Sequence, residues 1–246
     1  MRPVLSLLFV LISLGVVSGQ KLYKAVEAHD YEQVKALLAK GENVNKYAKN
    51  GLFPLWRAAA DNDTAMVRLL LSNGANIHQK SKGEAPITAL FYPVQEGFLD
   101  MVKLLVSLGA DIRQPGPSGQ TSIRVAARNG HLDVLIFLLE KGADLDDKTA
   151  NDGATPLEGA AAMGHLDIVQ YLVGKGANIN HQDRDKDTPI GEAAIKGHFE
   201  VVKYLLEHGA DPTLKNKEGY DAAYRARIGG QSKIAAYLQE FVDGKK

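Results

Sequence analysis

The sequence has no cysteine among its 246 residues. Disulfides and thiolate-bound zinc are therefore excluded, and packing alone must stabilise the fold. An excess of charge is also missing, because 29 Lys and Arg residues balance 29 Asp and Glu residues. Without a basic excess, neither nucleic acid nor an anionic membrane surface is expected as a partner.

Long apolar runs are absent except at the N-terminus. Residues 4–17 are uncharged and mostly apolar, follow Arg2, and lead into the small residues Ser18 and Gly19. This pattern is typical of a secretory signal peptide and is short for a membrane span. We expect a signal peptide at 1–19 and a mature domain at 20–246, exported to a bacterial periplasm or, as second choice, secreted. An uncleaved N-terminal anchor is the alternative.

Motifs for catalysis are also missing. The sequence has no Gly-x-Ser-x-Gly, no His-Glu-x-x-His and no phosphate-binding loop, since the glycines of 116–122 lack the following Lys. The acid pairs Asp146-Asp147 and Asp183-Asp185 fall in predicted loops, where solvated carboxylates are expected rather than acid–base catalysis. We therefore predict no enzyme activity and no cofactor, with an unrecognised enzyme as a remaining alternative.

A repeated triplet dominates what is present. Gly-Ala-Asp, Gly-Ala-Asn or a variant begins at Gly41, Gly74, Gly109, Gly142, Gly176 and Gly209, with steps of 33, 35, 33, 34 and 33 residues. An amphipathic stretch with helical spacing precedes the triplet, as in 131–144. We expect the glycine to end this helix with a positive φ. Such a period predicts a repeat protein.

A shorter helix is predicted before each amphipathic one. The segments 121–130, 155–164 and 188–197 begin with Thr, and each contains an Ala pair. Thr can cap a helix, and the Pro that follows it in two segments is tolerated at the first helical position. The polar segments between units are expected to form turns or hairpin-like loops.

The unit resembles the ankyrin repeat. The match is best at residues 153–180, whose sequence is GATPLEGAAAMGHLDIVQYLVGKGANIN. The resemblance covers residues 21–240 and implies an all-α ankyrin-repeat solenoid of stacked helix-turn-helix units with hairpin-like loops. The expected full repeats are 51–82, 83–118, 119–152, 153–185 and 186–218, flanked by capping units at 21–50 and 219–241.

Two histidine positions are informative. The family's Thr-Pro-Leu-His histidine is replaced in every copy, by Trp56, Thr88, Arg124, Glu158 and Gly191. A second row, His131, His165 and His198, recurs in successive units. Packed helices lie about 8–10 Å apart, so these histidines are too distant to share a zinc ion. We predict no metal site, and the resemblance implies that each histidine organises the turn between its two helices.

The resemblance also implies that a partner protein binds the face formed by loop tips and first helices. Trp56 is interpreted either as a contact or as a filler between helices, and the charged loops either as orienting a partner or as simply solvated. The candidate contacts are those that depart from the repeat: Tyr47, Lys49, Leu52, Trp56, Lys80, Lys82, Phe91, Tyr92, Val94, Arg113, Gln120, Arg128, Lys148, Met163, Arg184 and Lys196.

The segment 89–100 breaks the period. Counting from Gly83 places a first helix at 86–91, and counting back from Gly109 places its turn at Gly97, which leaves three residues over. Pro93 is expected to break the helix. The resulting bulge at 91–96 would expose Tyr92 and Val94 as part of a partner site, with simple repeat drift as the alternative.

Together these observations predict a non-catalytic, monomeric interaction scaffold in the cell envelope that binds another protein, without stable membrane insertion after signal cleavage. The alternatives are an inhibitor or immunity protein that neutralises a toxin or enzyme, and a secreted effector that binds host proteins.

Overall fold

The computed structural model describes residues 20–244, and the predicted signal peptide at 1–19 lies outside them. Contacts divide the described residues into two compact units. Unit 1 comprises 20–93 and 98–111, and unit 2 comprises 94–97 and 112–244. All regular structure in this range is helical, and none of its helices has the length and apolar character needed to cross a membrane.

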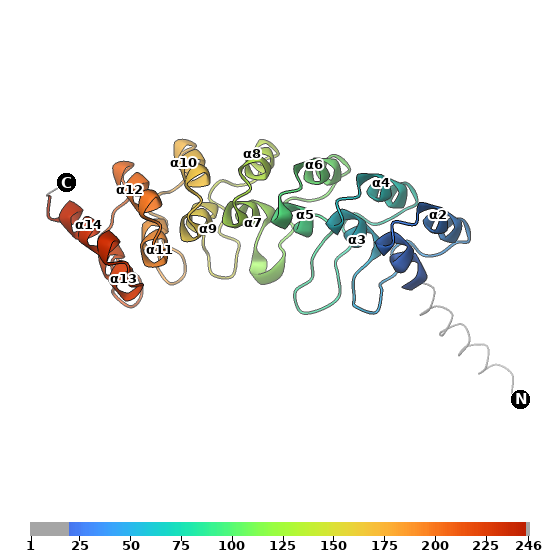
Figure 1. The fold of residues 1–246 in the computed structure, drawn as a ribbon, viewed down its shortest axis with the longest axis horizontal. Coiled ribbons are helices and arrows are strands. Elements are labelled where there is room, and N and C mark those ends of the chain that lie inside the picture. The colour runs from blue at the N-terminus through green and yellow to red at the C-terminus, as the bar shows by residue number, and fades with distance from the viewer. Residues whose placement is uncertain (1–19, 245–246) are drawn as a thin grey trace, which may run out of the picture. The chain divides into compact units, whose positions relative to one another are not determined.

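Unit 1 is built from short helix pairs (Figure 1). Its core contains fully buried Met66 and Leu70 from one helix and Met101 and Leu105 from another. Residues 20–27 are helical and precede the labelled elements. These are α2 (Tyr31–Ala39), α3 (Pro54–Ala60), α4 (Thr64–Ser72) and α6 (Leu99–Ser107), while α5 (Phe91–Glu96) contributes residues to both units.

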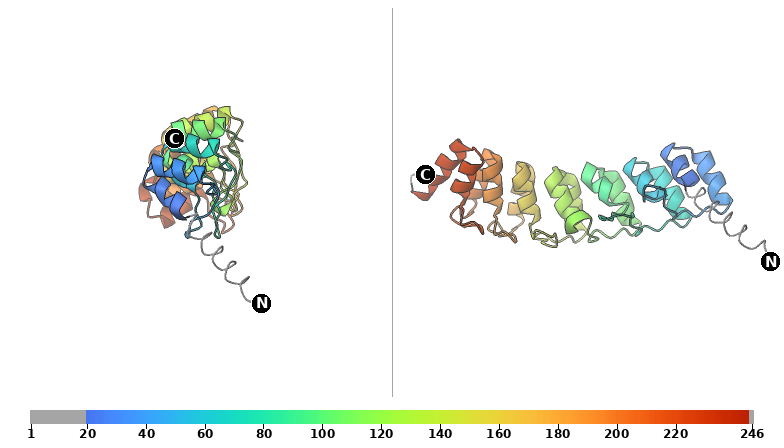
Figure 2. Two further views of the ribbon diagram at one scale, coloured as in Figure 1. Left: turned by 90° about the vertical axis from the view of Figure 1, so that its right-hand side faces the viewer. Right: turned by 90° about the horizontal axis from the view of Figure 1, so that it is seen from below.

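Unit 2 repeats the pair more regularly. Figures 1 and 2 show its first helices in one row, its second helices in another, and the loops leading into α9 and α11 projecting from the same side. The elements are η1 (Pro117–Gly119), α7 (Ser122–Asn129), α8 (Leu132–Glu140), α9 (Pro156–Met163), α10 (Leu166–Gly174), α11 (Pro189–Lys196), α12 (Phe199–Glu207), α13 (Ala222–Ile228) and α14 (Ser232–Val242).

The predicted helix-start and helix-end signals act as expected in α9 and α11. Thr155 and Thr188 each accept a backbone N–H three residues on, from Glu158 at 3.3 Å and from Gly191 at 3.2 Å. Gly164 then ends α9 at a φ of 77°. Thr121 differs, because its hydroxyl donates to the Asp147 carboxylate instead of capping α7.

The recurring histidines link neighbouring repeats of unit 2. The Nε2–H of His165 donates to the Arg128 carbonyl at 3.0 Å, and that of His198 donates to the Ala162 carbonyl at 3.1 Å. Each histidine therefore bonds to the first helix of the preceding repeat, a contact that the predicted role in its own turn did not include. A Cβ added to Gly164 would lie 2.5 Å from His198 Nδ1, so glycine is required beside the ring.

The last repeat of unit 2 lacks this link. Gln231 occupies the histidine position, since its side chain lies against Gly197 as that of His198 lies against Gly164. Its amide donates to the Gly229 carbonyl at 3.1 Å, within its own helix pair. The α13–α14 pair is thus attached to the preceding repeat without an imidazole–carbonyl hydrogen bond.

The prediction for residues 91–96 is wrong. Pro93 does not break the helix, because it is the third residue of α5, where a backbone N–H has no helical acceptor to lose. Val94 is 0% exposed, so it is a core residue and no partner can reach it. Counted back from Gly97, Pro93 and Val94 take the places of the Ala pair, and Phe91 rather than Thr88 takes the place of the motif histidine.

The extra residues lie upstream of α5 instead. This helix begins eight residues after Gly83, whereas α9 begins three residues after Gly153. Glu84, Ala85 and Pro86 are exposed. Ser81 closes the loop by donating its backbone N–H to the Ile87 carbonyl at 2.8 Å.

Candidate functional site

The predicted contact residues fall into three groups by exposure. Only Val94 is buried. Tyr47, Leu52, Trp56, Lys80, Phe91, Tyr92 and Gln120 are half-buried. The exposed group consists of Lys49 and Lys82 in unit 1 and Arg113, Arg128, Lys148, Met163, Arg184 and Lys196 in unit 2.

In unit 1, the half-buried members mostly hold the repeats together. The Tyr47 hydroxyl donates to the Lys80 carbonyl at 2.9 Å, and Lys82 Nζ lies 4.6 Å from the Tyr47 ring centroid. The rings of Trp56 and Tyr92 meet edge-on with centroids 5.9 Å apart, and Trp56 Nε1 is buried without a hydrogen-bond partner among the described residues. These contacts favour the filler interpretation of Trp56.

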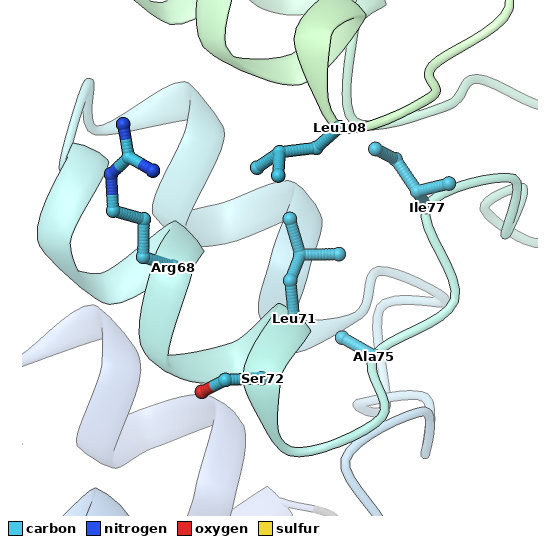
Figure 3. A pocket seen from close by; sticks show the side chains of 6 residues that line it. All are labelled: Arg68, Leu71, Ser72, Ala75, Ile77 and Leu108. Atoms are coloured by element: carbon cyan, nitrogen blue, oxygen red, sulfur yellow. The ribbon is translucent and has the colours of Figure 1, made fainter.

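A pocket of about 560 Å³ lies on the second-helix side of unit 1 (Figure 3). Leu71 of α4, Ile77 and Leu108 form its apolar wall, with Arg68 at the rim. None of the predicted contact residues lines it. In unit 2, Arg113 borders a smaller pocket of about 290 Å³ together with Ile112, Ile123 and Asp147.

The first helices of unit 2 enclose a set of charges. On α7, the buried Arg124 makes two hydrogen bonds to the Asp152 carboxylate, at 2.7 and 2.6 Å. Burial raises the pKa of Asp152, but hydrogen bonds from Arg124 and from the Ala154 backbone N–H, together with the charge of Arg124, outweigh it and hold the pKa below its ordinary value. The pair is asymmetric, because the Arg124 side chain is 4% exposed and that of Asp152 is 50% exposed.

A second buried arginine, Arg225 of α13, pairs with two carboxylates. Arg225 Nη2 donates to Glu192 Oε1 at 2.7 Å, and Nη1 lies 2.6 Å from Asp187 Oδ1 in ion-pair contact. Space for the guanidinium comes from Gly191, where a Cβ would lie 3.1 Å from Nη1. Burial raises the pKa of Asp187 despite the nearby Arg225.

Between the two arginines lies Glu158, which is 4% exposed. Burial, followed by the charges of Asp183 and Glu192, raises its pKa to about 9. This carboxyl group is therefore protonated and neutral at pH 7. The interior charges of these first helices are thus either paired or neutralised.

The exposed ends of the same helices differ in chemistry from repeat to repeat. Arg128, Met163, Lys196 and Ile228 lie within the last two residues of α7, α9, α11 and α13. Met163 is 47% exposed and Ile228 is 55% exposed. All four residues belong to unit 2, and three of them are predicted contacts.

Sequence reasoning missed several of these residues. Arg124 and Glu158 were recognised only as replacements of the motif histidine, although a charged residue at a position expected to be buried signals a paired or neutralised group. Ile228 and the 41%-exposed Tyr224 were missed because residues 219–241 were interpreted only as a cap. No group of His, Asp or Glu side chains suited to a metal ion occurs within 20–244.

Short stretches of the chain are similar to vertebrate proteins. It is 44% identical over 54 residues to the Notch-regulated ankyrin repeat-containing proteins of Homo sapiens and Xenopus tropicalis, covering 22% of this chain and 47% of each relative. It is 42% identical over 67 residues to protein phosphatase 1 regulatory subunit 27 of Homo sapiens, covering 27% of this chain and 43% of that protein. The chain therefore spans about half the length of the curated relatives it matches.

These relatives contradict the predicted localisation. They are vertebrate proteins named for Notch regulation and for protein phosphatase 1 regulation, and none is a bacterial periplasmic or secreted protein by name. The periplasmic address was inferred from the signal-peptide pattern of residues 2–19, which lie outside the described residues. That prediction is wrong on this comparison.

The family matches cover most of the chain. The description "Ankyrin repeats (3 copies)" matches residues 22–116, and "Ankyrin repeats (many copies)" matches 123–173, 157–206 and 192–239. The stacked helix pairs agree with these matches and confirm the predicted all-α repeat fold. The chain belongs to the ankyrin repeat family.

Proposed function

We propose that this ankyrin repeat protein is a non-catalytic scaffold that binds a partner protein through the loop and first-helix face of unit 2. One observation carries the proposal. The buried contacts use equivalent positions in successive repeats, as with His165 and His198, whereas the exposed helix ends carry Arg128, Met163 and Lys196. A scaffold that is constant inside and variable outside is what partner recognition on a repeat array requires.

The apolar part of this surface supports the proposal. Met163, Tyr224 and Ile228 are large apolar or aromatic side chains left substantially exposed, and all three lie on first helices of unit 2. Exposed apolar side chains on a rigid scaffold are typical anchors of protein interfaces. The relative named as a phosphatase regulatory subunit also supports a role exerted through a partner rather than through catalysis.

Site-specific photo-crosslinking tests this function. A photoreactive side chain at Met163 is expected to capture a defined partner from an extract of the native cells. The same group at Lys203, exposed on the second helix α12, serves as the matched control and should not capture that partner. Equal capture from both positions, or none from Met163, would contradict the proposal.

A further inference from the structure

The apolar wall of the pocket in unit 1 contains a residue that departs from the repeat. Leu108 directly follows α6 and is 42% exposed. One exposed leucine is ordinary on a protein surface, but this one lies beside Leu71 and Ile77 in the same wall (Figure 3). The residues that follow α2, α4, α8, α10 and α12 are all polar: Lys40, Asn73, Lys141, Lys175 and His208.

Leu108 also lacks a hydrogen bond that a polar residue makes at this place. Asn73 Nδ2 donates to the Leu69 carbonyl at 2.8 Å, four residues back in α4. A leucine side chain has no donor, and in α6 the hydroxyl of Ser107 donates to the Leu104 carbonyl at 2.7 Å instead. The end of its own helix therefore gives no reason for a leucine here.

The rim of the pocket carries a cation, Arg68, which forms no hydrogen bond or ion pair within residues 20–244. The equivalent Lys35 of α2 is paired with Glu32, one helical turn earlier, at 2.9 Å. In α4 the place of that glutamate is taken by Ala65. A guanidinium has five N–H donors and no acceptor, so Arg68 favours a carboxylate from outside the chain.

Other charged side chains of unit 1 do not change this balance. Asp100 and Lys103 are exposed on α6, have opposite signs and lie one helical turn apart. Asp111 follows the end of α6, and like the other two it does not line the pocket. Among the described residues, the lining contains Arg68 and no anion. A group that enters the pocket therefore has Arg68 as its charged neighbour.

The spacing of these groups on α4 specifies the geometry of the ligand. Arg68 and Leu71 are three residues apart, so they share a face of α4 and lie about 4.5 Å apart along its axis. A second helix lying along α4 has the same rise, so a carboxylate three or four residues from an apolar side chain matches this spacing. The exposure of Leu108 suits a side chain on a helix surface, whereas a free fatty acid requires a more enclosed cavity.

We propose that this pocket binds an amphipathic helix of a partner protein. A leucine-like side chain of that helix packs between Leu71, Ile77 and Leu108, and a carboxylate one turn away pairs with Arg68. The inference goes beyond the proposed function, because the pocket belongs to unit 1 and the surface proposed above belongs to unit 2.

A synthetic helical peptide provides the probe. Isolated helices shorter than about 12–15 residues are marginal, so we would use the alanine-rich sequence AQALLQAEQALLQAAQAA. Acetylated and amidated ends leave its glutamate as the only charge. Leucines stand three and four residues from the glutamate on both sides, so both helix directions are tested. Titration calorimetry with the full chain should show saturable binding that weakens with added salt.

Two matched peptides test the carboxylate. One has lysine in place of the glutamate, and the other has the glutamate moved two residues on, to the opposite face of the helix. Each should bind at least about threefold more weakly, because neither can pair a carboxylate with Arg68 while its leucines occupy the pocket.

Variants of the chain locate the binding. Leu108→Asn introduces the residue that follows α4 and should weaken binding at least about tenfold, because the leucine loses its apolar contact with the peptide. Arg68→Glu should weaken binding about fivefold. The matched control is Lys103→Glu, the same charge reversal at the equivalent position of α6 outside the pocket, which should bind as the unmodified chain does. Circular dichroism of each variant verifies that the helices remain folded.

Binding that Leu108→Asn and Arg68→Glu both weaken, and that Lys103→Glu leaves unchanged, would support the inference. Absence of binding at about 1 mM peptide, equal binding of the lysine peptide, or unchanged affinity of Leu108→Asn would overturn it. Binding of dodecanoate without binding of the peptide would identify a lipid-like ligand instead. Self-association of the chain that Leu108→Asn abolishes, measured by sedimentation, would assign the pocket to a second copy. Either of these two results also overturns the inference.

Discussion

Replacing Glu158 by glutamine should abolish a large pH dependence of stability. The pKa of this buried carboxyl group rises from 4.5 to about 9 on folding. Between these values the folded chain retains a proton that the unfolded chain releases, so stability is greatest at acid pH and falls as the pH rises towards 9. The free energy of unfolding falls by about 1.4 kcal/mol per pH unit, or about 4 kcal/mol from pH 5 to pH 8.

Urea denaturation at pH 5, 6, 7 and 8, followed by circular dichroism, measures this effect. The amide introduced by E158Q does not titrate, so the difference in unfolding free energy between the unmodified chain and this variant should change by about 4 kcal/mol across the range. Equal denaturant slopes are needed for the comparison. Glu200→Gln removes an exposed carboxyl group of α12 and serves as the control. If E158Q and E200Q show the same pH profile, the reasoning is refuted.

Three further predictions concern the stability of the repeats, each measured by chemical denaturation. Asp152→Ala should lower the free energy of unfolding by about 3 kcal/mol, because it leaves Arg124 buried and unpaired. Arg124→Met should lower it by only about 1 kcal/mol, because the Asp152 that remains is half-exposed. Equal losses for the two variants would contradict this asymmetry. Gly164→Ala should lower the free energy of unfolding by clearly more than the roughly 1–2 kcal/mol of left-handed backbone strain, because the new Cβ would also clash with the His198 ring. Gly176→Ala is the control: its φ is 87° and nothing lies within 4 Å, so it should lose only the strain energy. Similar losses for the two variants would argue against the clash with His198. Val94→Ala should cost about 2–3 kcal/mol, and a surface-like loss near zero would restore the bulge hypothesis.

Much of the regular fold could be predicted because its signals are local. Thr155, Pro156 and Gly164 specify the start and end of α9 within ten residues of one another, and the structure uses them as capping chemistry requires. The helix periodicity before each Gly-Ala-Asp triplet is equally local. These positions needed no knowledge of the neighbouring repeat.

The errors arose where a neighbouring repeat decides the outcome. The end of α5 is fixed by Gly97, where a Cβ would lie 2.5 Å from His131 Nδ1, so the additional residues were displaced upstream of the helix. Counting from Gly83 could not detect that constraint. Likewise, the raised pKa of Glu158 depends on burial between helices and on Asp183 from the following loop. One repeat read by itself contains neither contact.

Gln231 stands where the preceding repeats have a histidine, and this replacement connects partner binding to the stability of the α13–α14 pair. Without the imidazole–carbonyl bond, the α13–α14 pair should be the part of unit 2 that opens most readily by local unfolding. Ile228 lies on that pair, whereas Met163 lies two first helices before it. A partner that contacts both Met163 and Ile228 would bind only while the α13–α14 pair is folded, and would therefore shift the local unfolding equilibrium of this pair towards the folded state by mass action. Binding of the partner would then protect the C-terminal helices α13 and α14 from hydrogen exchange and proteolysis.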